Sequence, residues 1–216
     1  MENELIKSLP EGLKAVTKVL EISEKLGSFL ARMLGDVPEN MVGILGGDFL
    51  RHLRIRNVEK LTERTSKILK GRDQEKDTIP VSPNIALPLL NAAKDESREE
   101  LQELWARMLA NAMDPSRSSA VRQNIIETVR AFEPIDAKVL ETASALHEPQ
   151  QHVMASKLKE RLKATLFELE VSLRNLEGCG CIAITLRGSS QEKGIIETET
   201  ITITYLGHEV LRACSP

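Results

Sequence analysis

The side chains best suited to metal or redox chemistry in this sequence are its cysteines. Cys179 and Cys181 stand two positions apart in a β-like run, so a strand would point both thiols to one face. A zinc site usually needs a second such pair, and the sequence has neither that pair nor an H-E-x-x-H spacing among its four histidines. We therefore expect structural thiols, with a redox or metal role as the alternative, at all three positions: Cys179, Cys181 and Cys214.

Carboxylates and short motifs give no sign of a familiar reaction. The acidic group at 95–103 lies mostly at the predicted start of a helix, where the helix dipole already favours negative charge. The spacing of a calcium loop is missing, and so are the G-x-S-x-G, dinucleotide-binding and phosphate-cradling motifs. The sequence therefore predicts a protein that is not an enzyme and that carries no cofactor and no metal, with an enzyme of an unfamiliar type as the alternative.

Positive charge is concentrated in one segment. Residues 51–72 hold eight basic side chains against two glutamates, an excess of +6 in a chain whose net charge is −3. Four of the basic residues follow helical spacing and would form one basic stripe: Arg56, Lys60, Arg64 and Lys67. Such a stripe fits an acidic protein surface or anionic lipid headgroups. The alternative is an ordinary solvated helix face, compensated in part by the pair Glu63 and Lys67.

Three glycines precede the basic stripe inside an apolar stretch. Gly43 and Gly47 form a G-x-x-x-G pattern, and Gly46 stands beside them. Each glycine in the middle of a helix costs about 1 kcal/mol relative to alanine, so the cluster indicates a purpose other than helix propensity. Close packing of another helix is the plainest interpretation; a hinge, a membrane-active segment or an interface are the alternatives.

Apolar periodicity predicts a mainly α fold, a multi-helix body followed by a winged-helix-like α+β module. The body covers residues 1–133, with long helices at about 11–34 and 38–70, a polar linker at 71–82 and further helices within 83–132. Ser97 and Glu100 fit a capping box for a helix that runs to about Met113. A further helix is predicted at about 118–132. Trp105 should be the largest buried anchor of this body.

The module covers residues 134–216. Helices are predicted at 134–147, 153–162 and 165–177, followed by the apolar run CIAITL, a polar loop, an alternating run that ends in ITITYL, and a short closing helix. Three helices and then a β-hairpin is the order of a winged helix; a generic α+β tail is the alternative.

A winged helix raises the hypothesis of a DNA-binding regulator. Its third helix would enter the major groove, but the segment at 165–177 carries Glu168, Glu170 and Glu177 with Arg174 as its only basic side chain. Carboxylates facing phosphates oppose binding, and the chain has a net charge of −3 and only 3% aromatic residues. Nucleic acid is therefore an unlikely partner, and DNA-binding regulation is kept as the alternative function.

Hydropathy and the first residues indicate location. The sequence has no apolar run near the roughly 18 residues of a membrane-spanning helix. Its start, MENELIKSLPEG, lacks the basic and apolar regions of a signal peptide. We expect a soluble, cytoplasmic protein.

Residues 79–140 carry a family resemblance. The stretch IPVSPNIALPLLNAAKDESREELQELWARMLANAMDP, and then AFEPIDAKVLE, resembles the abortive-infection alpha family of bacterial phage-defence proteins. The segments NLEGCGCI and YLGHEVLRAC extend the similarity over most of the chain, and it is weakest before residue 50. The GCGCI turn departs from relatives, which more usually carry a basic and apolar turn there, and this weakens a DNA-binding role further.

The resemblance implies antiviral defence and phage resistance, in which growth of the infected cell is halted. It supplies no catalytic residue. Together with the basic stripe and the glycines it suggests a non-enzymatic effector that acts through protein or membrane contacts. The expected partner is a protein from the host, the phage or a neighbouring gene, with a homo-oligomer or a peripheral membrane contact also open.

Overall fold

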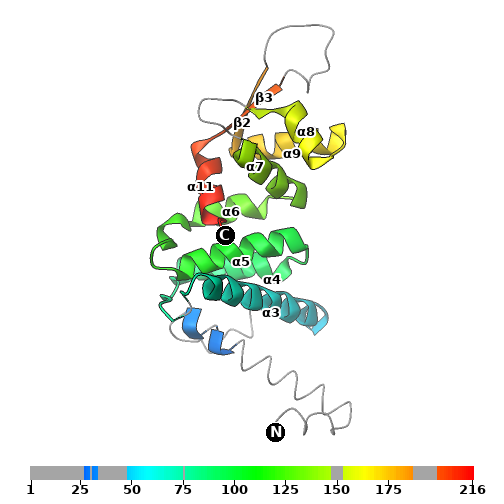
Figure 1. Ribbon diagram of the computed structural model, residues 1–216. Helices are drawn as coiled ribbons and strands as arrows, with labels where there is room; N and C mark the ends of the chain where they lie inside the picture. Colours follow the sequence, from blue (N-terminus) through cyan, green and yellow to red (C-terminus); the bar gives the residue numbers. More distant parts are fainter. Residues whose placement is uncertain (1–26, 30, 34–47, 75, 147–152, 187–198) are drawn as a thin grey trace.

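The computed structural model describes residues 27–29, 31–33, 48–74, 76–146, 153–186 and 199–216. Within these ranges the chain is mainly helical and carries a small sheet near its C-terminal end. Figure 1 shows α3, α4 and α5 stacked in one half of the molecule, and α7, α8 and α9 with the sheet in the other half. The mainly α class is confirmed; the order of its elements is consistent with a winged-helix-like module but does not by itself establish one.

The described residues form helices and strands in the following order along the chain. Their bounds are α3 (Asp48–Gly71), α4 (Pro83–Asp95), α5 (Glu99–Met113), the 3₁₀ turn η2 (Ser118–Ala120), α6 (Gln123–Arg130), α7 (Pro134–Leu146), β1 (Val153–Met154), α8 (Ala155–Leu162), α9 (Leu166–Gly178), β2 (Ile182–Leu186), β3 (Glu199–Ile203) and α11 (Tyr205–Ala213).

The long helix α3 packs against α5 and α4. Leu61, Thr65 and Leu69 recur at intervals of four and are buried on its inner face. The hydroxyl of Thr65 donates to the carbonyl of Leu61 at 2.8 Å, so this polar group needs no partner in the core. The predicted helix at 38–70 is confirmed from Asp48 onward, and it ends at Gly71. Most of the predicted helix at 11–34 lies outside the described residues.

The start of α5 differs from the prediction. The capping box at Ser97 is wrong: the helix begins at Glu99, Arg98 occupies the N-cap position, and no side chain caps the first turn. Glu96 takes the backbone N–H of Arg98 at 2.8 Å, and Glu100 pairs with Lys138 of α7 at 2.9 Å. Glu100 is therefore used in a tertiary contact that a local pattern does not show, and Glu96 satisfies a backbone N–H two residues along.

The predicted single helix at 118–132 is also wrong in part. A 3₁₀ turn at Ser118–Ala120 comes first, and α6 begins only at Gln123. Val121 stands between them in an extended conformation with its side chain buried. The interruption lets Val121 and the face of α6 formed by Ile125 and Ile126 contribute to the core together.

The sheet has three antiparallel strands in the order β1–β3–β2. In β3, Ile201 faces Val153 of β1 and Ile184 of β2 across the ladder. Strand β2 agrees with the predicted run CIAITL, whereas β3 ends at Ile203, and Tyr205 and Leu206 of the run ITITYL lie in α11. Strand β1 was not predicted, because residues 153–154 were assigned to a helix. The tip between β2 and β3 lies outside the described residues.

A turn joins α9 to β2 and corrects the expected place of two cysteines. Cys179 caps α9 and Cys181 precedes β2, so they do not share a strand. Gly180, at φ +74°, reverses the chain. The N–H of Cys181 donates to Leu176 at 2.9 Å and that of Gly180 to Glu177 at 2.8 Å, which is the Schellman ending of a helix.

Body and module share one apolar core. Buried side chains from Phe29 to Cys214 form a single cluster, in which Trp105 is only 2% exposed, as predicted. Buried Asp136 of α7 ties this helix to α9, accepting from Ser172 at 2.6 Å and from Asn175 at 2.6 Å. The division of the chain at residue 133 stays a prediction.

Candidate functional site

The basic stripe lies on α3, and the structure divides it into two pairs. Lys60 Nζ lies 2.9 Å from Oε1 of Glu99 at the start of α5, and Arg64 binds the same carboxylate. These hydrogen bonds, from Lys60 first and then Arg64, lower the pKa of Glu99. Lys60 and Arg64 therefore fasten α3 to α5 in addition to any contact they make with a partner.

The other two members of the stripe point to solvent. Arg56 and Lys67 are exposed, and neither has an ion-pair partner among the described residues. Arg54, which is outside the stripe, reaches Asp95 at 2.6 Å. Arg56 and Lys67 lie three helical turns apart, and the role of the four stripe residues as a contact surface stays a prediction.

The candidate glycines Gly43, Gly46 and Gly47 lie outside the described residues. Close packing, a hinge, a membrane-active segment and an interface at these residues all stay predictions.

Helix α9, the expected third helix of a winged helix, begins with a capping box that sequence analysis missed. The Thr165 side chain accepts from the N–H of Glu168, and the Glu168 carboxylate takes the N–H of Thr165 at 2.9 Å. The T-x-x-E pattern in the sequence could have revealed it. Hydrogen bonds from Thr165 lower the pKa of Glu168, so this carboxylate is stabilised in its charged form by its own helix.

The outer face of α9 carries large exposed apolar side chains among charged ones. Phe167 is 81% exposed and Val171 is 69% exposed, one turn apart, while Leu169, Leu173 and Leu176 on the opposite face are buried. Leu166 is 45% exposed beside them.

The carboxylates along this helix are engaged within it. Arg174 pairs with Glu170 at 2.9 Å and with Glu177 at 3.3 Å.

Helix α8 and its C-cap residue precede α9 in the chain and add positive charge. Their four cations are all exposed, and none forms an ion pair among the residues that the structure describes: Lys157, Lys159, Arg161 and Lys163. Sequence analysis missed them as a site, although the alternating pattern KLKERLK was visible. We call the seven side chains of this region the α8–α9 tip: Lys157, Lys159, Arg161, Lys163, Leu166, Phe167 and Val171.

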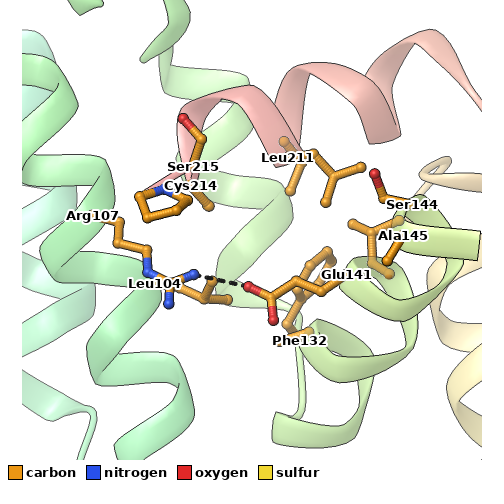
Figure 2. Close-up of a pocket in the computed structure, with 13 residues that line it drawn as sticks. Leu104, Arg107, Phe132, Glu141, Ser144, Ala145, Leu211, Cys214 and Ser215 are labelled. Atoms are coloured by element: carbon orange, nitrogen blue, oxygen red, sulfur yellow. Dashed lines mark hydrogen bonds and ion pairs between the residues drawn. The ribbon is translucent and has the colours of Figure 1, made fainter. Parts of the chain in front are cut away.

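A cavity of about 300 Å³ lies between α5, α7 and α11, and Figure 2 shows it. Its walls are mostly apolar, with Leu104, Leu140 and Leu211 among them. At its edge Arg107 donates to Glu141 at 2.9 Å and also to Glu103 at 3.0 Å. Because the cation is already paired twice, the cavity would hold a ligand mainly by apolar contact.

Two of the three thiols, those of Cys181 and Cys214, are buried in the fold. Burial raises the pKa of Cys181 to about 12, and burial likewise raises the pKa of Cys214, beside the cavity, to about 12. Since the thiolate is the reactive form, these residues are poor nucleophiles. Over the described ranges, no group of three or more histidine, cysteine or acidic side chains is placed to hold a metal ion.

A polar network fastens the end of the chain to the body. Asn111 Nδ2 donates to the carbonyl of Ala213 at 2.8 Å, while Arg72 donates to Asn111 Oδ1 at 2.8 Å and to the carbonyl of Ser215 at 3.2 Å. We call the four side chains of this network the C-terminal clamp: Arg72, Asn111, Asp114 and Arg117. Sequence analysis missed it because its partners lie about a hundred residues apart.

Comparison with known families gives a match over most of the chain. The sequence model of the family described as abortive infection alpha matches residues 54–214. The chain belongs to the abortive infection alpha family. This membership indicates a role in abortive-infection defence. No curated protein and no solved structure matches it.

The matched range of this abortive infection alpha protein contains several of the structural features described above. It begins at Arg54, so it includes the basic stripe, the C-terminal clamp and the α8–α9 tip, and it leaves out the three glycines. Within the part of the chain that the structure describes, no helix has both the length and the apolar character needed to cross a membrane.

Proposed function

We propose that this abortive infection alpha protein is a non-enzymatic defence effector, which arrests the infected host cell by contact with a protein or a membrane. In this proposal residues 134–216 form a winged-helix-like module that serves contact rather than DNA reading. Family membership supports the defence role, and the surface of the module supports action by contact.

The observation that carries the proposal is the apolar outer face of α9. Among the described residues seven large apolar side chains are exposed, and three of them fall within six positions of this helix: Leu166, Phe167 and Val171. Single exposed apolar residues are ordinary, but several gathered on one helix face indicate a binding surface. Substitution of this face should therefore remove the activity and leave the fold intact.

The test is a phage challenge of bacteria that express the full chain. We expect the wild type to halt growth of infected cells and to reduce phage yield, and the double variant Phe167→Ser with Val171→Ser to lose both effects. The control is Tyr205→Ser, which alters a side chain that is 94% exposed at the start of α11. It should behave as the wild type.

Two results would contradict the proposal. One is a wild type that changes neither growth nor phage yield. The other is a double variant that melts at the wild-type temperature and still protects. The same assay applied to Arg56→Glu with Lys67→Glu tests the basic stripe separately, because both side chains are exposed and surface charges of this kind contribute little to stability.

A further inference from the structure

We propose that the α8–α9 tip docks on the surface of an anionic phospholipid bilayer, with the cations of α8 at the headgroups and Phe167 inserted at the headgroup–acyl boundary. The inference rests on the proposed function in that it names the partner of the same surface. It is argued from charge, exposure and backbone geometry.

The charge of the tip is positive in a chain that is negative overall. Residues 155–171, which contain the tip, hold four cations against three carboxylates, a net charge of +1, whereas the whole chain has a net charge of −3. Two of the three carboxylates have partners on their own helix or its cap: Glu168 is engaged by Thr165 in the capping box, and Glu170 pairs with Arg174. The four cations have no ion-pair partner in the described ranges, so their charge is available to an external anion.

The cations belong to a short amphipathic helix, α8, and to its C-cap. Leu158 is fully buried and Leu162 packs against the core, which fixes the inner face of α8. Long flexible basic side chains on the remaining arc can reach many mobile headgroups without a fixed geometry. An anionic bilayer offers that kind of partner.

The apolar face beside these cations favours lipid over nucleic acid. Phe167, Val171 and Leu166 gain free energy when they leave water for hydrocarbon, and they gain nothing from phosphate groups. On the helix that would enter a DNA groove, the outward ridge is Phe167 and Val171, flanked by Glu168 and Glu170. Basic and apolar side chains together are typical of interfacial binding.

The backbone between the helices gives a further observation. Lys163 caps α8 at φ +52°, in the left-handed region that favours glycine. The turn itself therefore does not favour a lysine at this position. In the sequence, Lys163 places a cation between α8 and Phe167. Figure 1 shows α8 and α9 at the end of the molecule remote from α3.

The experiment is co-sedimentation of the purified full chain with vesicles. Vesicles of phosphatidylethanolamine and phosphatidylglycerol are compared with vesicles of phosphatidylcholine, at low and at high salt. We expect binding to the anionic vesicles alone, weakened by salt because the attraction is screened. Lys157→Gln with Lys159→Gln should weaken binding about 25-fold, about fivefold for each cation. Phe167→Ser should weaken it roughly tenfold.

Matched controls keep the test specific. Arg56→Gln with Lys67→Gln removes two exposed cations from α3 and should leave binding unchanged. Lys163→Gly should weaken binding without lowering the melting temperature, since glycine suits the left-handed turn. In Phe167→Trp, the new indole should shift to shorter wavelength on anionic vesicles, while Trp105 is buried and provides a constant background.

The inference is overturned by equal binding to both kinds of vesicle, or by tip variants that bind as the wild type does. It is also overturned if the chain does not bind vesicles and instead binds duplex DNA, or a second copy of itself, through the tip. Phage protection that depends on Phe167 without vesicle binding would overturn the lipid partner and leave the proposed function standing. Tip-dependent vesicle binding without any growth arrest would support the lipid partner and contradict the proposed function.

Discussion

Trp105 and Phe167 differ in what surrounds the ring. Trp105 is 2% exposed among the helices of the body, whereas Phe167 is 81% exposed on α9. We expect Trp105→Ala to lower the free energy of unfolding by about 3–5 kcal/mol, because a large cavity is left in the core. Phe167→Ala should change it by less than about 0.5 kcal/mol. Urea unfolding followed by circular dichroism measures both, and equal midpoints for the two variants would contradict the assignment.

The buried thiols should resist modification. Because burial raises the pKa of Cys181 and Cys214 to about 12, almost no thiolate is present near neutral pH. Iodoacetamide should therefore label these two positions slowly in the native chain and rapidly in urea, as read by mass spectrometry of peptides. Labelling at one rate in both conditions would show that they are accessible.

Single residues were predictable where their surroundings are local. Trp105 was correctly predicted to be buried, because the apolar period of its own helix places it on the inner face. Asp136 and Asn111 were not predicted as anchors, because the groups they bind come from α9 and from the end of the chain. The pairing of Lys60 and Arg64 with Glu99 was hidden for the same reason.

Elements with a long apolar period were predicted well. Helices α5, α7, α8 and α9 have bounds within a few residues of those expected, since an amphipathic face marks them. Strand β1 was missed because two residues have no period of their own and become a strand only by pairing with β3. The cations of the α8–α9 tip were visible in the run KLKERLK, but their lack of ion pairs among the described residues was not.

Two glycines of neighbouring elements should respond oppositely to alanine. A Cβ on Gly207, in α11, would fall 2.1 Å from the carbonyl oxygen of Cys181, a backbone atom that has little room to move. Gly207→Ala should therefore destabilise the chain by about 3 kcal/mol or fail to fold. Gly178→Ala, at the end of α9, meets nothing within 4 Å and should be neutral or slightly stabilising.

Thermal melting of both variants is the measurement. Gly178→Ala is the matched control, because it makes the same chemical change at a helix end where the space is open. A Gly207→Ala variant that melts with the wild type would show that α11 does not approach the α9–β2 turn this closely.

The C-terminal clamp joins residues that lie far apart in the sequence, and the stability that it contributes should fall in acid. Desolvation acts to raise the pKa of Asp114, but hydrogen bonds from Ser116 and the charges of Arg72 and Arg117 outweigh it, so this pKa is lowered. A lowered pKa contributes stability that is present above the ordinary range of an aspartate and is lost as the pH falls through the folded value. The melting temperature should therefore fall in acid.

The measurement is the melting temperature between about pH 7 and pH 3. Asp114→Asn should reduce the steepness of the decline rather than remove it, because the pKa values of Asp95 and Glu96 are also lowered. An unchanged slope in that variant would show that Asp114 does not contribute to the clamp.

The central position of β3 sets an order of events during synthesis. Strand β1 pairs with Ile201 and Thr200, which the ribosome adds about fifty residues later. The side chain of Asn111 likewise cannot bind the carbonyl of Ala213 until that residue has been added. Closing such long loops is slow relative to helix formation. A nascent chain that has not reached these positions has helices but no finished sheet and no fastened end. Any activity that requires the complete fold is therefore absent until the residues of β3 and α11 have joined the structure.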